Sequence, residues 1–322
     1  ERYGVEKVCS PDELFSDPEI DAILNLTIPE AHSEINEAAL EAGKHVYVEK
    51  PLAVDLEAGR RVVDLAESRG LYLGCAPDTF LGGGGQTCRK IIDEGIIGTP
   101  VSATAFMAGH GHESWHPDPA FYYQTGGGPM LDMGPYYITA LVNLIGPAKR
   151  VVGHTSRALE ERIATSEARM GERIAVDVST HQTGVIEFKN GAVGTVIMSF
   201  DDWNHTLPRI EIHGTHGSIS VPDPNTFGGP IMLFREGDES SREIPVYAFG
   251  YCENSRGLGL ADMASAIQNR RPSRASGRLA LHVLETMLAF EESSGAMRYI
   301  DISTKAERPE PLPTGLKNGE ID

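Results

Sequence analysis

The segment HVYVEKPLAV, residues 45–54, begins as an apolar strand and then ends in an acid, a lysine and a proline. Because side chains alternate along a strand, Lys50 would point to the side that the strand's valines occupy. A cation directed at an apolar layer is costly unless something there requires it. A lysine can act as an acid or a base, and Pro51, which is sometimes cis, would fix the backbone that aims it. An isolated EKP is also compatible with a surface lysine paired with Glu49.

A second candidate lies in GGGPMLDMGPYYITALVNLIGP, residues 126–147. Apolar residues at helical spacing predict a helix that begins near Pro135. If the preceding turn is already helical, Asp132 and Tyr136 share one face, and a carboxylate beside a phenol can orient it as a proton donor. The alternative interpretation makes Asp132 a helix N-cap and Tyr136 a core aromatic.

The segment HGHESWHPD contains two histidines four residues apart, His112 and His116. On a helix they could be metal ligands, but the neighbouring glycine and prolines argue against a regular helix. We therefore expect no metal, and a loop along a ligand cleft in which His116 or Trp115 touches the ligand. Tyr122 and Arg256 are further cleft candidates, although simple packing of Tyr122 and a solvated position for Arg256 are equally compatible.

The elements around Lys50 alternate between strand and helix. Apolar runs at 21–29, 45–49 and 71–76 predict strands, and the segments between them show helical spacing with glycine stops. Near-continuous apolar strands joined by helices are typical of a parallel sheet covered on both faces. In such a sheet, ligands bind at the carboxyl ends of the strands, where Lys50 lies.

The pattern changes near residue 100. Asn190-Gly191 lies between two β-rich runs and predicts a hairpin over 183–200. Two closing helices are predicted by apolar residues in register, one over 258–269 and one around 280–287. Further short strands are expected at 209–214, 217–221 and 231–234. The second half therefore reads as an antiparallel sheet with helices.

Composition excludes several classes of protein. The chain has 322 residues, enough for two domains, and its formal net charge of −18 would repel nucleic-acid phosphates and anionic lipids. Its apolar runs fall short of the ~18 residues that a membrane span needs. Four scattered cysteines without a CxxC pair suit reduced thiols in a cytosolic protein. We therefore expect a cytoplasmic protein with neither nucleic acid nor membrane as a partner.

Taken together, the two candidate stretches resemble the Gfo/Idh/MocA family of nicotinamide-dependent sugar oxidoreductases. The resemblance runs from about residue 4 to 300 and rests on DAILNLTIPEAHSEINEAALEAGKHVYVEKPLA, GGGPMLDMGPYY and IEIHGTHGSISV. It implies an α/β protein with a doubly wound (Rossmann-type) parallel sheet in a partial dinucleotide-binding domain, residues 1–100. Residues 101–322 would form a substrate-binding and oligomerisation domain with a large, mostly antiparallel open sheet, which often forms the subunit contact.

The resemblance also implies roles for single residues. The family's motif lysine falls on Lys50, the carboxylate of its catalytic helix on Asp132, and its proton-relay position on Tyr136, where many members have histidine. Contact with substrate would involve Tyr136 and the cleft candidates. The positions along a bound NAD or NADP correspond to Thr27, Pro29, His32, Glu49 and Lys50.

The predicted function is hydride transfer between this cofactor and a sugar, polyol or inositol-like substrate bound between the domains. Lys50 would be directed at the reacting hydroxyl or carbonyl and share its proton with Tyr136. The nearby ammonium would stabilise the phenolate of Tyr136, whose ordinary pKa is ~10, and Asp132 would hold the geometry. The family pattern also implies a homo-oligomer, a dimer or a tetramer, assembled through the open sheet.

A complete family member opens with a strand, a GxGxxG turn and a helix, and the sequence from Glu1 onward begins after that unit. We therefore expect a longer parent protein that supplies the pyrophosphate loop. The glycine run at 82–85 follows the third strand and is expected to be a loop. Two alternatives stay open. One is a regulator that binds dinucleotide or sugar without turnover, or an inactive truncated homologue, and the other is an NAD-using hydrolase or lyase with transient oxidation.

Overall fold

The computed structural model describes residues 4, 7–246 and 249–322. In this part of the chain, the first sheet has three parallel strands in the order β1-β2-β3, with Leu24 opposite Tyr47 and Val48 opposite Cys75. The strands are β1 (Ala22–Asn25), β2 (His45–Val48) and β3 (Leu73–Cys75). Their helices are α1 (Pro11–Ser16), α2 (His32–Glu41) and α3 (Leu56–Ser68). The predicted alternation of strand and helix is confirmed.

The large sheet contains nine of the strands in the described residues, in the order β13-β12-β11-β10-β4-β9-β8-β5-β14. Only β4 and β9 pair in parallel; the other neighbours are antiparallel. Its strands are β4 (Pro100–Ala108), β5 (Ala148–Ser156), β8 (His181–Phe188), β9 (Val193–Ser199), β10 (Ile210–Gly214), β11 (Gly217–Val221), β12 (Ile231–Arg235), β13 (Arg242–Ile244) and β14 (Ile300–Asp301). The predicted mostly antiparallel sheet and its Asn190-Gly191 hairpin are confirmed, and β6 (Glu161–Ile163) and β7 (Arg173–Ala175) form a separate ribbon.

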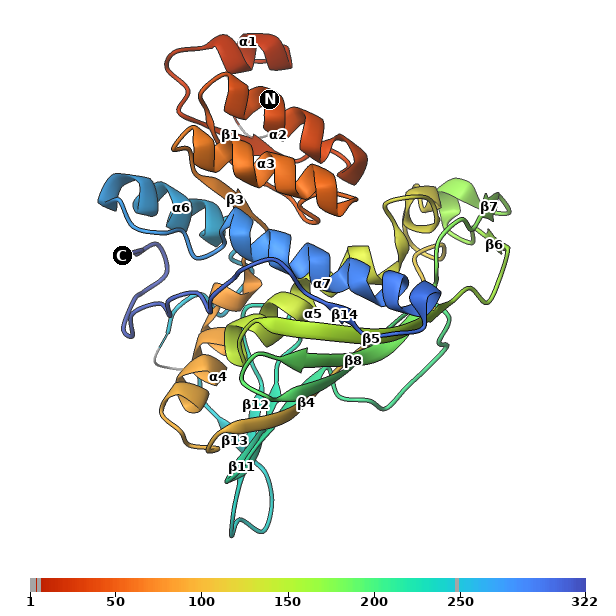
Figure 1. The fold of residues 1–322 in the computed structure, drawn as a ribbon, viewed down its shortest axis with the longest axis vertical. Coiled ribbons are helices and arrows are strands. Elements are labelled where there is room, and N and C mark those ends of the chain that lie inside the picture. Colours follow the sequence, from red (N-terminus) through yellow and green to blue (C-terminus); the bar gives the residue numbers. More distant parts are fainter. Residues whose placement is uncertain (1–3, 5–6, 247–248) are drawn as a thin grey trace.

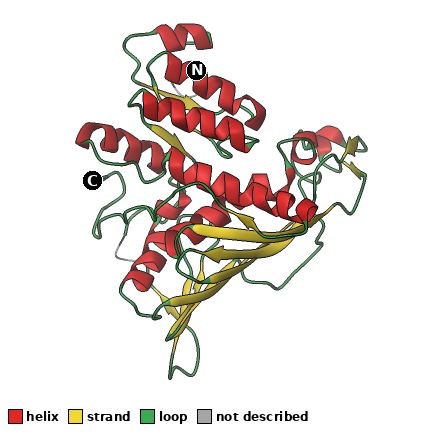
Figure 2. Ribbon diagram, in the orientation of Figure 1, coloured by secondary structure: helices red, strands yellow, loops and turns green. Residues whose placement is uncertain are grey.

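Helices cover one face of the large sheet, and Figures 1 and 2 show the strands of the other face uncovered. α5 (Gly128–Leu144) packs on β9 and β4, and α7 (Gly277–Ala296) packs on β5 and β8. The remaining α-helices are α4 (Gly83–Asp93) and α6 (Leu258–Asn269). Short 3-10 helices lie at Pro29–Ala31, Thr79–Leu81, Ala120–Tyr123 and Glu167–Arg169. Among the described helices, none has the length and apolar character to cross a membrane.

The end of the chain returns to the first sheet. α6 contacts β3, and α7 packs on both α3 and β3. The Cys75 N–H donates to the carbonyl of Ala275 at 3.0 Å, and Gly74 bridges to Ser276. Part of the predicted second domain, 101–322, therefore holds the first sheet against the large one.

The sequence predicted a loop for the glycine run at 82–85, and this prediction is wrong. The run is the start of α4. Gly82 is the N-cap, and the following glycines form the first turn. Their N–H groups reach another segment, since Gly84 donates to the carbonyl of Phe227 at 2.8 Å. A Cβ at Gly84 would lie 2.0 Å from the carbonyl oxygen of Gly228. The helix can begin here because this close approach compensates for the low helix propensity of glycine.

A buried histidine, His282, joins α7 to the edge of the large sheet. Its ring has no exposed surface, its Nε2 accepts the Ala148 N–H at 2.9 Å, and its Nδ1 lies 3.0 Å from Thr304 Oγ1. Because Nε2 must accept, the proton of the neutral ring belongs on Nδ1. Burial, assisted by Lys189, lowers the pKa of His282 to about 4.

We expect His282 to make the protein less stable in mild acid. In the unfolded chain this ring binds a proton below the ordinary pKa of about 6.5, whereas in the folded chain it stays neutral until about pH 4. The free energy of unfolding therefore decreases as the pH falls from about 6.5 to about 4. Across this window, wild type should lose about 3 kcal/mol more unfolding free energy than His282→Gln, measured by urea denaturation. The exposed-site variant His216→Gln should follow wild type, and equal slopes for wild type and His282→Gln would contradict the assignment.

Candidate active site

Asp132 and Tyr136 lie one turn apart on α5 because this helix begins earlier than predicted. It starts at Gly128 instead of near Pro135, with Pro129 in its first turn and Pro135 in its interior. Gly128 has φ +85°, a backbone conformation that favours glycine, and a proline is well tolerated in a first turn. The shared helical face that the sequence left open is therefore present.

Lys50 reaches α5 from the end of β2. Its ammonium donates to the main-chain oxygen of Asp132 at 2.6 Å and to Asp132 Oδ1 at 2.7 Å. Both side chains are mostly buried, with 18% and 12% of their surface exposed. An ammonium has three donors, and these two bonds are its hydrogen bonds to the described residues. One donor of Lys50 is thus left for a ligand. The Lys50–Pro51 peptide bond is cis.

The second oxygen of Asp132 is held by a histidine. His112 Nε2 lies 2.9 Å from Asp132 Oδ2, and the His112 ring packs 4.0 Å from Tyr122 between ring centroids. The segment around His112 is fixed from both sides, because Arg162 binds the Glu113 carboxylate at 2.7 Å and the His110 carbonyl at 3.0 Å. The carboxylate of Asp132 is therefore oriented by two groups from distant parts of the chain.

The sequence assigned His116 to the ligand cleft, which stays a prediction, and it did not predict the contact between His112 and Asp132. His116 accepts the Asp118 N–H at Nδ1 and packs against Trp115 and Tyr122, so it lies on the rim. His112 is 20 residues from Asp132 in an irregular segment, and no periodicity connects the two. Within the described residues, no group of three or more His, Cys, Asp or Glu is arranged to hold a metal ion.

The Tyr136 ring lies near the ammonium of Lys50. The Lys50 ammonium lies 5.5 Å from the centroid of the Tyr136 ring, and the Arg256 guanidinium lies 6.0 Å from it. Arg256 is exposed and donates to Asn225 Oδ1 at 2.7 Å. The Tyr136 ring therefore lies close to Lys50 and to Arg256. The convergence of the Lys50 ammonium and the Tyr136 hydroxyl on one ligand atom stays a prediction.

The electrostatics keep the ion pair charged and the phenol protonated. Burial lowers the pKa of Lys50, but the Asp132 carboxylate outweighs burial, and the net shift is upward. Burial raises the pKa of Asp132, but hydrogen bonds from His112 and Lys50 outweigh it, and the net shift is downward. Burial raises the pKa of Tyr136 above its ordinary value. Lys50 acts on Tyr136 in the expected direction, but burial is the larger effect.

A cavity of about 250 Å³ opens at the carboxyl ends of β1 and β2. Four of the expected cofactor positions line it, namely Thr27, Pro29, Glu49 and Lys50. Its other walls include Phe121, Tyr122, Leu131 and Asp132. Flat apolar walls beside two carboxylates and one ammonium suit a planar ring with a polar edge. The residues therefore fit the nicotinamide end of a dinucleotide.

His32 supports this cavity from behind instead of lining it, contrary to the expectation of direct cofactor contact. The side chain has no exposed surface. Its Nδ1 lies 2.7 Å from the Pro51 carbonyl and its Nε2 lies 3.0 Å from the Thr27 carbonyl. The ring thus joins the loop after β1 to the turn that carries Lys50, which makes it a positioning residue.

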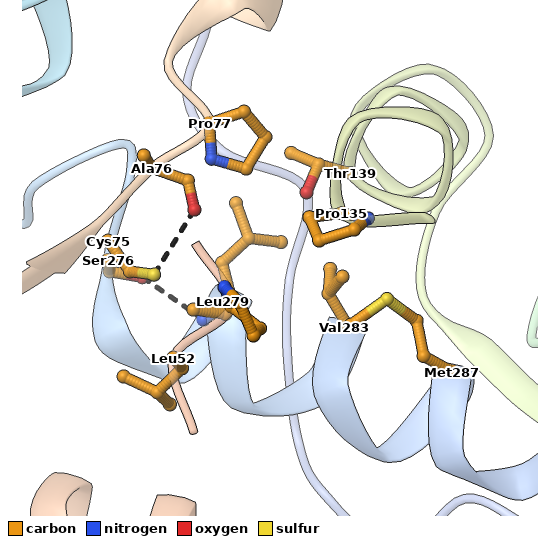
Figure 3. A pocket seen from close by; sticks show the side chains of 12 residues that line it. Leu52, Cys75, Ala76, Pro77, Pro135, Thr139, Ser276, Leu279, Val283 and Met287 are labelled. Carbon is orange, nitrogen blue, oxygen red and sulfur yellow. Dashed lines mark hydrogen bonds between the residues drawn. The ribbon is translucent and has the colours of Figure 1, made fainter. Parts of the chain in front are cut away.

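The apolar layer beneath the site is tightly packed. Figure 3 shows Leu52, Pro135, Val283 and Met287 around a residual space of only about 10 Å³. Pro51 also lines this space. The residues next to Lys50 and Tyr136 therefore rest on one common layer formed with α7, which holds the two side chains in a constant relation.

Comparison with known proteins identifies the family. The description "Oxidoreductase family, NAD-binding Rossmann fold" matches residues 1–76, and "GFO/IDH/MocA C-terminal domain" matches residues 86–220. The chain belongs to the Gfo/Idh/MocA family of oxidoreductases. This membership confirms the predicted Rossmann-type fold, the class of NAD(P)-dependent oxidoreductase and the nicotinamide cofactor.

Relatives within the Gfo/Idh/MocA family extend over most of the chain. The 1,5-anhydro-D-fructose reductase of Ensifer adhaerens is 30% identical over 314 residues, 94% of this chain and 86% of the relative. The myo-inositol 2-dehydrogenase of Thermotoga maritima is 27% identical, over 84% of this chain and 75% of the relative. A levoglucosan dehydrogenase solved with NADH and levoglucosan is 25% identical, with a TM-score of 0.77 over 94% of this chain and 85% of that one.

We expect His112→Phe to slow turnover about 10- to 100-fold, since a hydrogen bond to a charged group is worth about 1.5–3 kcal/mol. The loss should fall on kcat, because His112 orients Asp132 and the substituted ring still packs against Tyr122. Steady-state kinetics with the best sugar or polyol substrate measures it. His216→Phe, on the exposed turn between β10 and β11, serves as the matched control. A kcat equal to that of wild type would exclude His112 as a positioning residue.

Proposed function

We propose that this chain catalyses hydride transfer between NAD or NADP and a hydroxyl- or carbonyl-bearing carbon of a sugar, polyol or inositol-like substrate. One observation carries the proposal. Lys50 is held on Asp132 with one donor free, it lines the cavity at the ends of β1 and β2, and its ammonium lies 5.5 Å from the centroid of the Tyr136 ring. That is the arrangement needed to exchange a proton with an oxygen next to a hydride donor or acceptor.

The cofactor would be held by the residues that line this cavity. Thr27 and Pro29 come from the loop after β1, and Glu49 comes from the end of β2, with Phe121 and Tyr122 on the opposite wall. When bound, the nicotinamide supplies or accepts the hydride. Thr27 is itself held, because its N–H and its hydroxyl both donate to Asn25 Oδ1, at 3.1 and 2.7 Å.

In this proposal Lys50 and Tyr136 bind the reacting oxygen and transfer its proton. The free donor of Lys50 binds the reacting oxygen, and the Tyr136 hydroxyl exchanges a proton with it. Both groups hold their protons at neutral pH, because the pKa of each is shifted upward. This state suits donation to a carbonyl oxygen, which is the reduction direction. In oxidation Tyr136 first releases its own proton to solvent, and the resulting phenolate, whose cost the charge of Lys50 lowers, accepts the proton of the substrate hydroxyl.

The substrate class is supported by the rim of the site and by the relatives. Trp115 is 61% exposed and packs edge-on against His112 and His116. Together with Tyr122 it offers aromatic faces to the apolar C–H side of a ring, while His116 and Arg256 offer polar groups. According to their names, the relatives described above act on 1,5-anhydro-D-fructose, myo-inositol and levoglucosan. We therefore assign substrate contact to His116, Tyr122, Tyr136 and Arg256.

Lys50→Met should reduce turnover by at least about 100-fold while NADH binding persists, because the variant keeps the length of the side chain and loses its proton and charge. Absorbance at 340 nm with a panel of sugars and inositols measures turnover, and quenching of protein fluorescence measures NADH binding. Lys149→Met, at an exposed position of β5, is the matched control. Near-normal turnover of Lys50→Met would refute the proposal.

The same assay separates the alternative functions. A regulator would bind NADH and a sugar, and wild type would show no turnover with any of the panel. A hydrolase or lyase with transient oxidation would form product without net change at 340 nm. Retention of the buried Lys50–Asp132 pair, which is costly to bury without use, favours an enzyme over the regulator.

We also propose that the chain forms a homo-oligomer, a dimer or a tetramer, through the uncovered face of the large sheet. Rows of partly exposed side chains cross this face. Ile197 lies opposite Thr183 and Thr183 lies opposite His154, while Phe106, opposite Ile197, is buried. Apolar and threonine side chains on a continuous flat surface are typical of a subunit contact.

All four cysteines are free within the described residues, which suits the reducing cytoplasm that we propose as the location of the protein.

Ile197→Asp should convert the oligomer into single chains, because it places a charge at the centre of the proposed contact without a partner. Light scattering coupled to size-exclusion chromatography measures the mass, and circular dichroism verifies that the variant is folded. Ile163→Asp, on β6 and 52% exposed, should keep the wild-type mass. A wild-type mass equal to one chain would overturn the proposed assembly.

A further inference from the structure

A second cavity, of about 420 Å³, lies next to the glycine segment that leads into α5. It shares Gly126, Gly127 and Leu131 with the cavity at Lys50, but none of that cavity's charged residues. Its remaining walls come from α7, the first residues of β8 and the segment that precedes β8. Its volume falls in the range of about 300–1,000 Å³ typical of small-molecule sites.

The polar centre of this cavity is Gln182, on the covered face of β8. The side chain is about nine-tenths buried, with 8% of the residue exposed. Its Nε2 donates to Glu291 Oε2 at 3.3 Å, which sets the orientation of the amide, since the reverse would place a carbonyl against a carboxylate. Its Oε1 has no hydrogen-bond partner among the described residues. A buried acceptor in this position requires a donor from outside the protein.

The neighbouring groups are also acceptors. The Glu291 carboxylate accepts Ser179 Oγ at 3.1 and 3.0 Å, and the Asp177 carboxylate lines the opening. The one cation of the wall, Arg157, is already paired with Glu160 at 2.7 Å. The apolar part of the wall is formed by Met130, Leu131, Val178, Met287 and Leu288.

We propose that this cavity is an accessory site for a neutral polyhydroxylated ligand. Hydroxyl groups would donate to Gln182 Oε1 and to the carboxylates, while the C–H side of the ligand would pack on Leu288 and Met287. The ligand is either the second unit of an extended sugar substrate or a separate polyol. The site itself does not depend on the chemistry at Lys50.

Calorimetric titration of the full chain with myo-inositol, D-glucose and maltose tests the site without requiring turnover. We expect at least one probe to bind wild type and to bind Gln182→Met at least tenfold more weakly, because the variant keeps the volume and loses the acceptor. Leu288→Trp, which fills the cavity, should abolish that binding. Leu207→Trp, a matched change on an exposed loop, should bind as wild type does, and thermal unfolding verifies that each variant is folded.

Two further measurements distinguish a separate polyol from the second unit of a substrate that also occupies the cavity at Lys50. If myo-inositol or D-glucose still binds to Lys50→Met, and Leu288→Trp abolishes binding of the same probe, the ligand of this cavity is a separate polyol. Binding of maltose alone, weakened by both Leu288→Trp and Lys50→Met, identifies the second unit of a substrate that spans both cavities. Equal binding by wild type, Gln182→Met and Leu288→Trp, or no saturable binding of any probe to wild type, overturns the proposal and leaves the function at Lys50 untouched.

Discussion

The site depends on one buried interaction, the ammonium of Lys50 against the carboxylate and main-chain oxygen of Asp132. A cation taken out of water is costly, so it requires a charged partner in good geometry. Here the partner comes from α5, which supplies both the Asp132 carboxylate and the main-chain oxygen of the same residue. The interaction joins the end of β2 to α5 and thereby the first sheet to the large one.

A second buried network, centred on Arg162, holds in place the segment that carries His112, the other partner of Asp132. Arg162 is 2% exposed and is bound by the carboxylates of Glu113 and Asp201, while the Tyr123 hydroxyl donates to Glu113. Removing one member of such a group leaves an uncompensated charge, at a cost of about 3–5 kcal/mol. This network fixes an otherwise irregular segment, so that His112 meets Asp132 without support from a helix or strand. Rigid support of this kind is what a site needs when its catalytic side chains come from distant segments.

The relation between the two sheets rests on α7, which packs on β5 and β8 and also on α3 and β3. Small residues allow this close approach. A Cβ at Gly59 of α3 would lie 2.9 Å from Leu284 Cδ2, and a Cβ at Gly134 of α5 would lie 2.9 Å from Met287 Sδ. The layer formed there also backs the turn after Lys50, so α7 positions the catalytic groups without touching them. The same helix supplies Glu291 to the accessory cavity, which brings both cavities onto one rigid support.

The sequence alone determined the order and type of most elements, because the periodicity of apolar residues and the Asn190-Gly191 turn are local signals. It also singled out Lys50, Asp132 and Tyr136, through motifs whose residue types are unusual at their positions. Tertiary structure decided the rest. The glycines at 82–85 form a helix only because another segment packs against them, His112 rather than His116 meets Asp132, and His32 supports the cofactor loop from within the core. Each of these outcomes is a contact between residues far apart in the chain, and local periodicity carries no record of such contacts.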